Sequence, residues 1–134
     1  MLDLIPQIDG VLKKPSRIAI KAKGRILFID PADVVTVEAQ GNYVLLRRMS
    51  GSDLLRDSMS SVAERLHPYG FVRIHRSVLI NTSFVEEIRP LTTGGRGHVL
   101  RVKGGKEFHV SRTYKKNLHF ITPLWFGTDG FAAN

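Results

Sequence analysis

The chain has 134 residues, the size of one domain with its own hydrophobic core. With 43% hydrophobic and 24% charged residues, it lies in the range of folded globular domains and outside the range of disordered chains. It contains no cysteine, which excludes disulfides and thiolate metal sites, and its apolar runs are far below the roughly 20 residues needed to span a bilayer. We therefore expect a cytoplasmic protein without a membrane segment.

The formal net charge of +8 is distributed unevenly along the chain. Residues 1–66 hold ten Lys and Arg against eight Asp and Glu, whereas residues 67–134 hold ten against four. A positive field of this kind attracts polyanions such as nucleic acid. A solvated basic surface that serves only solubility is the alternative interpretation.

Residues 1–16 show no sustained hydrophobic period, and their two prolines are typical of a leader or linker. Beyond them, short segments rich in β-branched and aromatic residues recur between turn residues, as in an all-β domain. The predicted strands are 17–21, 26–29, 34–38, 43–48, 54–56, 71–74, 78–80, 85–91, 98–102 and 106–110. Turns that contain glycine are predicted at 23–24, 50–51 and 103–105, and a looser loop at 94–97. They favour hairpin connections and a β meander.

Two short helices interrupt the predicted strands. Asp57 or Ser58 is placed to cap the first, which runs over 59–66 and buries four residues at helical spacing: Met59, Val62, Ala63 and Leu66. Pro68 and Gly70 then end it.

The second predicted helix covers 112–121, with Ser111 as its cap. Tyr114, Leu118 and Ile121 form its apolar stripe. Its first turn is basic, which is unfavourable for the helix dipole and indicates that an anion binds there.

The segment 71–81 contains a polar interruption within an apolar strand pattern. Alternate residues of a strand share a face, so a continuous strand would place Arg76 among aliphatic side chains. An unpaired guanidinium buried there would cost several kcal/mol in order of magnitude. The sequence therefore predicts that the strand bends or ends near His75 and projects Arg76 outward.

Catalytic motifs are absent from the sequence. The five histidines lack the spacing of a zinc site, and there is no nucleophile elbow or phosphate-binding glycine loop. We expect no metal, no cofactor and no enzymatic activity. A phosphodiesterase that uses His75, His109 and Lys106 stays open as an alternative, although no spacing favours it.

Three segments place polar or basic side chains at a turn or at the end of an element: 40–43, 75–77 and 111–113. Arginine pairs with guanine and asparagine with adenine, while serine and threonine bind phosphates. Arg76 and Arg112 have no acidic residue within four positions. Asn42 could instead serve its turn, Tyr43 could be half-buried by packing, and Asn81 is expected to close a turn.

Four motifs together resemble the LytTR DNA-binding family, the effector domains of bacterial response regulators that control transcription. They are 34-VVTVEAQGNYVLL-46, 58-SMSSVAERL-66, 71-FVRIHRSVLIN-81 and 108-FHVSRTYKKNL-118. The third, with its spacing to its neighbours, is the most specific. The resemblance covers residues 17–121, so we expect a domain there, a leader before it and a tail over 122–134.

This resemblance implies a mainly β fold of elongated antiparallel strands in small sheets with two short helices. It also implies that loops enter the major groove of double-stranded DNA, with contacts from Asn42, Tyr43, Arg76 and Arg112. Other expected DNA contacts are His75 and Ser77 beside Arg76, and the phosphate-neutralising candidates Lys115, Lys116, Arg47, Arg48 and Arg73. A homodimer on paired half-sites is the expected assembly, and an RNA-binding or protein-interaction β module is the alternative function.

Overall fold

The computed structural model describes residues 17–91 and 97–127. The predictions of a leader over 1–16, of most of the loop at 94–97 and of the end of the tail lie outside these residues. The described part is mainly β, as expected, with short strands in small antiparallel sheets and two short helices. Its strands are β1 (Ile18–Ala22), β2 (Arg25–Ile29), β3 (Val34–Gln40), β4 (Tyr43–Arg48), β5 (Gly51–Leu55), β6 (Phe71–His75), β7 (Val78–Asn81), β8 (Val85–Pro90), β9 (His98–Val102) and β10 (Glu107–Val110).

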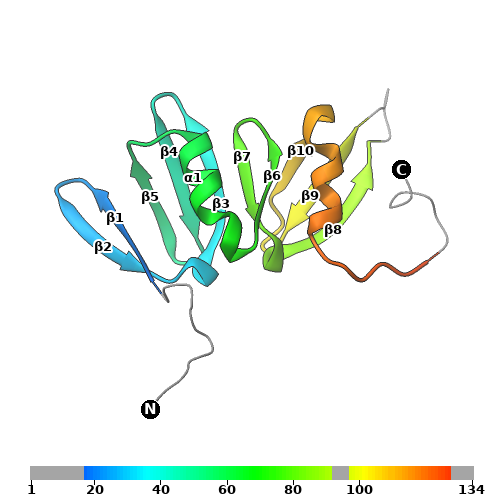
Figure 1. The fold of residues 1–134 in the computed structure, drawn as a ribbon, viewed down its shortest axis with the longest axis horizontal. Helices are drawn as coiled ribbons and strands as arrows, with labels where there is room; N and C mark the ends of the chain where they lie inside the picture. The colour runs from blue at the N-terminus through cyan, green and yellow to red at the C-terminus, as the bar shows by residue number, and fades with distance from the viewer. Residues whose placement is uncertain (1–16, 92–96, 128–134) are drawn as a thin grey trace, which may run out of the picture.

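The strands form three antiparallel sheets side by side along the long axis of the molecule (Figure 1). A hairpin of β1 and β2 lies at one end, a five-stranded sheet of order β5-β4-β3-β7-β6 lies in the middle, and a three-stranded sheet of order β10-β9-β8 lies at the other end. The predicted meander is wrong for the central sheet, because β3 pairs with β7 rather than only with its neighbour in sequence.

Strands β3 and β7 of the central sheet are buried on both faces. One face packs against the α-helix α1 (Met59–Leu66), and its core includes Val37, Phe71 and Leu79. The opposite face packs against the three-stranded sheet, and its core includes Ile74, Ile80 and Leu100. Burial on both faces explains the continuous apolar run in β7, since consecutive residues point into different cores.

Helix α1 begins as predicted, with Ser58 as its cap. The Ser58 Oγ accepts a hydrogen bond of 3.1 Å from the backbone N–H of Ser61, which satisfies one of the free donors of the first turn. A 3₁₀ turn, η3 (His67–Tyr69), follows, and Gly70 with φ +88° reverses the chain into β6.

The C-terminal helix is a 3₁₀ helix, η5 (Arg112–Phe120), and the predicted side-chain cap is wrong. The Ser111 side chain makes no cap hydrogen bond, and its carbonyl oxygen instead accepts the N–H of Tyr114 at 3.0 Å. The predicted apolar stripe is confirmed, because Leu118 is buried and Tyr114 and Ile121 are half-buried. Neither helix among the described residues is long and apolar enough to cross a membrane.

Candidate nucleic-acid interface

Three chain reversals lie along one edge of the molecule, the upper edge in Figure 1. They are the β3–β4 turn, the β6–β7 turn and the start of η5, and we call them the turn edge (residues 40–43, 75–77 and 111–113). Two backbone hydrogen bonds join them. The N–H of Ala39 donates to the carbonyl of Ser77, and the N–H of Ser111 donates to the carbonyl of Ile74, both at 2.9 Å. The structure thus brings together the three segments that the sequence singles out.

The β3–β4 turn presents Asn42 and Tyr43. Gln40 pairs with Tyr43, so the connection has two residues, and Gly41 occupies the left-handed region at φ +61°. The Asn42 side chain is exposed and makes no hydrogen bond with any residue that the structure describes, so its amide does not serve the turn. Tyr43 is 40% exposed.

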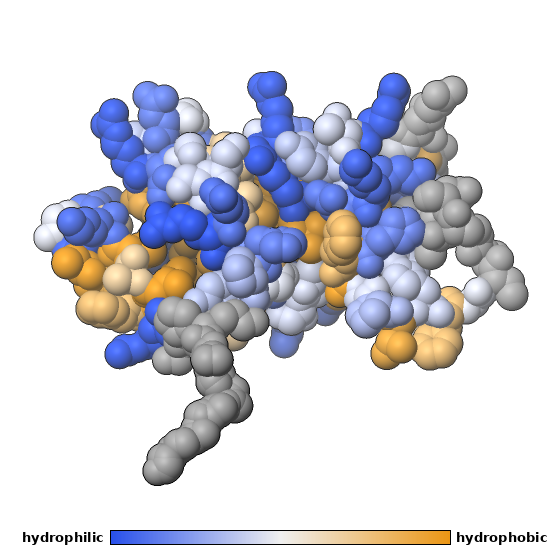
Figure 2. Space-filling view, in the orientation of Figure 1, coloured by the Kyte–Doolittle hydropathy of each residue, from blue (hydrophilic) through white to orange (hydrophobic). Residues whose placement is uncertain are grey.

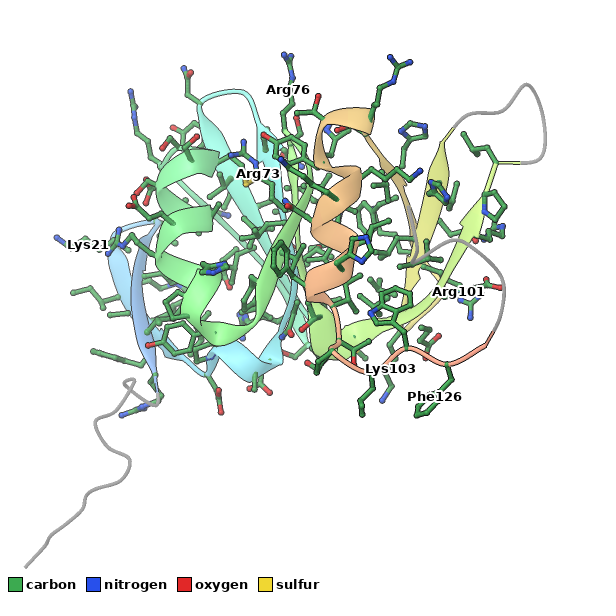
Figure 3. The ribbon with its side chains drawn as sticks, turned by 45° about the vertical axis from the view of Figure 1, so that its right-hand side comes forward. Lys21, Arg73, Arg76, Arg101, Lys103 and Phe126 are labelled. Atoms are coloured by element: carbon green, nitrogen blue, oxygen red, sulfur yellow. The ribbon has the colours of Figure 1, made fainter. Side chains whose placement is uncertain are left out.

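The β6–β7 turn projects Arg76 as predicted. The pairing of β6 with β7 shifts between Arg73 and His75, and the strand ends there. Arg76 is exposed and points away from the body of the molecule (Figure 3). Among the described residues, no carboxylate pairs with it. The ring of His75 has a local function, because its Nδ1 accepts the N–H of Ser77 at 3.1 Å and so holds the turn.

Arg73, two residues before His75, is half-buried between α1 and η5 (Figure 3). Its Nη2 donates to the carbonyl oxygen of Arg76 at 2.6 Å, and its Cζ lies 5.4 Å from the centre of the Tyr114 ring. Its Nε is buried with no hydrogen-bond partner in the described part of the chain. The side chain expected to face phosphate therefore folds inward against its own turn.

The third segment contributes Arg112, and Lys115 and Lys116 follow it on η5. All three residues are exposed. Within residues 17–91 and 97–127, no carboxylate pairs with any of the three. Burial, and secondarily the positive charge of Lys115, lower the pKa of His98 on the neighbouring strand β9. The charge of Lys115 thus acts on His98 at the start of β9.

Two other arginines expected to neutralise phosphate are engaged within the protein. Arg47 Nε donates to the Glu38 carboxylate at 2.6 Å, and Arg48 Nη2 donates to Asp53 at 2.6 Å. Both lie near the far end of β4 from the turn edge (Figure 1). The structure does not support their expected role.

The distribution of hydrophilic and apolar side chains on the surface agrees with the position of the turn edge. Figure 2 shows long hydrophilic side chains projecting along the turn edge, whereas apolar side chains gather below, at the two ends of the molecule. Lys103 and Phe126 lie on the side opposite Arg76 (Figure 3).

The sequence did not indicate how the turn edge is held together. Asn117 Nδ2 donates to the carbonyl of Arg73 at 2.9 Å, across 44 positions of the chain. With Tyr114, it attaches η5 to β6. The sequence placed Tyr114 in the apolar stripe of the predicted helix, but it did not single out Asn117 or identify the partner of either residue.

Comparisons with known proteins agree with this geometry. The profile of the LytTr DNA-binding domain matches residues 24–121. The sensory transduction protein LytT of Bacillus subtilis is 28% identical over 102 residues, which are 76% of this chain and 42% of that protein. The CO-responsive transcriptional regulator RcoM of Rhodospirillum rubrum is 31% identical over 68 residues, 51% of this chain and 29% of that protein. The chain thus spans less than half the length of these curated relatives.

The fold is shared as well. A solved LytTr DNA-binding domain from Bacillus cereus superposes with a TM-score of 0.68 at 19% identity, and the match covers 81% of this chain and 97% of that one. The family profile extends from the β1–β2 turn to the residue after η5, which is most of the chain. The chain therefore belongs to the LytTR family of DNA-binding domains of transcription regulators.

Proposed function

We propose that this domain recognises a specific double-stranded DNA sequence by inserting the side chains of its turn edge into the major groove. The observation that carries the proposal is that Arg76 and Arg112 are exposed and lack a carboxylate partner among the described residues, while hydrogen bonds hold their two segments side by side. A free guanidinium on a fixed turn is suited to bind guanine through two parallel hydrogen bonds.

Six side chains of the turn edge have a proposed role. Arg76 and Arg112 read guanines, and Asn42 reads an adenine through its amide. Tyr43 packs its ring beside the bases or donates its hydroxyl to phosphate, and Ser77 binds phosphate. His75 supports the turn through its Nδ1, which leaves its Nε2 for a phosphate contact. Lys115 and Lys116 neutralise phosphates next to these contacts.

We propose further that two copies bind paired half-sites in the cytoplasm. One turn edge meets only a short stretch of duplex, and a two-fold arrangement doubles the contacts without a new surface. The chain spans less than half the length of the relatives that it matches, so the homodimer and its half-site spacing are proposed rather than taken from them.

Selection from a random duplex library, followed by affinity measurements, tests the proposal. Arg76→Ala and Arg112→Ala should each reduce affinity for the selected duplex by about 1–3 kcal/mol and relax the preference at one base pair. Arg25→Ala is the matched control, because it removes the same charge from the exposed tip of the β1–β2 hairpin. Equal losses on selected and random duplex for Arg76→Ala would contradict base reading.

Two further measurements separate the alternatives. Readers of single-stranded RNA stack bases on exposed rings, but in the described residues the exposed aromatic side chain at the turn edge is Tyr43. Single-stranded RNA should therefore compete poorly with the selected duplex. The phosphodiesterase alternative requires cleavage of labelled RNA or DNA that disappears in His75→Ala or His109→Ala.

A further inference from the structure

The surroundings of Arg73 are unusual for a residue next to a DNA-binding turn. Its guanidinium contacts three separate elements: the carbonyl oxygen of Arg76 at 2.6 Å, the Oγ of Ser60 in α1 at 3.5 Å, and the ring of Tyr114 in η5 at 5.4 Å from its centre. A planar group with several donors is needed to bridge such partners, and a lysine ammonium would reach only one of them well.

The backbone of the same residue is also fixed. Its carbonyl accepts the side-chain amide of Asn117, and the next residue, Ile74, accepts the N–H of Ser111. Arg73 therefore links the turn of Arg76 to η5, because its side chain binds that turn and lies against Tyr114, while its main-chain carbonyl binds Asn117 within η5. Burial of its Nε without a partner in the described residues is an energetic cost that these contacts offset.

From these contacts we infer that Arg73 is a positioning residue for DNA recognition rather than a phosphate contact. It fixes the backbone from which Arg76 projects and couples that turn to η5, which carries Arg112. The inference rests on the proposed function, in which Arg76 reads a base. A misplaced turn would lose the two parallel hydrogen bonds of Arg76 with guanine, while the net attraction between protein and phosphates would change little.

Comparison of a charge-conserving substitution with a charge-removing one distinguishes the two roles. Affinities of Arg73→Lys and Arg73→Gln are measured on the selected duplex and on random duplex over a salt series. Both variants should lose about tenfold on the selected duplex, as expected for one weakened base contact, and little on random duplex. The slope of log affinity against log salt should stay at the wild-type value in both. Lys116→Ala is the control, because loss of a phosphate contact lowers that slope by about 0.9.

A phosphate contact would give a different pattern. Arg73→Lys would then bind nearly as wild type, and Arg73→Gln would lose affinity for both duplexes together with a lower slope. That pattern would overturn the inference. Tyr114→Leu offers a second variant that leaves every charge in place. It should also weaken binding to the selected duplex at constant slope, and wild-type affinity would count against the coupling.

Amide hydrogen exchange in the free protein tests Arg73 without DNA. The N–H of Ser77 is held by His75 within the turn that Arg73 braces, so its exchange should accelerate in Arg73→Lys, while Val37 in the core stays protected. Unchanged exchange at Ser77 would refute the positioning role. If the wild-type protein selected no duplex at all, the proposed function would fail, but this measurement would still decide the role of Arg73.

Discussion

Asn81 Nδ2 donates a hydrogen bond of 2.9 Å to the carbonyl oxygen of Val34, across 47 positions of the chain. The bond joins the end of β7 to the start of β3. Both lie at the opposite end of these strands from the turn edge (Figure 1). Asn81 Oδ1 accepts the N–H and the hydroxyl of Ser83, and the residue is only 4% exposed. All its polar atoms thus serve the fold, as expected for an asparagine that closes a turn.

Substitution of this asparagine should therefore affect stability. Asn81→Ala leaves the Val34 carbonyl without its buried partner, so the free energy of unfolding should fall by about 1–3 kcal/mol in urea titration. Asn42→Ala is the matched control, since that side chain is exposed, and its change should stay within about 0.5 kcal/mol. A similar loss of stability in both variants would contradict this division between a structural and a surface asparagine.

The position of each strand was largely predictable from the sequence, whereas the pairing of the strands was not. Alternating apolar residues and glycine turns located the strands in the correct order, with bounds that differ by only a few residues, and β4 and β9 match their predicted bounds. The pairing of β3 with β7 depends on contacts between distant segments, for which local periodicity holds no information. The predicted meander fails for that reason.

The residues of the site divide in the same way into those that the local sequence predicts and those that depend on distant contacts. Arg76 was predictable as exposed because burial of an unpaired charge is costly, and the structure confirms its projection. Arg47 and Arg48 were not distinguishable from phosphate-binding arginines, because their carboxylate partners, Glu38 and Asp53, lie on the adjacent strands β3 and β5. The inward orientation of Arg73 depends likewise on α1 and η5, which the sequence alone does not place beside β6.

The two lysines of η5 should act on DNA affinity through charge alone. Lys115→Ala and Lys116→Ala should each weaken binding to selected and random duplex alike and lower the salt slope by about 0.9. Filter binding or fluorescence anisotropy between low and moderate salt measures this slope. Lys103→Ala removes an equal charge on the side opposite Arg76 and should leave the slope unchanged. A change of base preference in Lys115→Ala would show that its contact is more than electrostatic.

The β3–β4 turn depends on Gly41. Its φ of +61° lies in the left-handed region, where a side chain costs about 1–2 kcal/mol, although a Cβ atom at this position would meet no other atom within 4 Å. Gly41→Ala should therefore lower the free energy of unfolding by about that amount through backbone strain alone. Gly41→Asn should cost less, because asparagine tolerates this conformation better. Equal stabilities for glycine and alanine would mean that the turn adopts another conformation.

The pKa of His98 should change when DNA binds to the neighbouring surface. Burial, and then the charge of Lys115, hold its pKa below the ordinary value of 6.5, so the folded protein binds this proton less readily than the unfolded chain. Its contribution to stability is full above pH 6.5 and is lost as the pH falls through the lower folded pKa. Substitution of Lys115 by alanine removes the second cause and should raise the pKa in an NMR titration of the free protein.

Bound phosphate near Lys115 should raise the same pKa, because it offsets the positive charge that opposes protonation. Complex formation would then take up a proton, and affinity for the selected duplex should increase as the pH falls from 6.5 toward the lower pKa of His98 in the free protein. His98→Gln should remove this part of the pH dependence without changing the salt slope at higher pH, where the histidine is neutral. An identical His98 titration in free and bound protein would place the phosphate backbone away from η5.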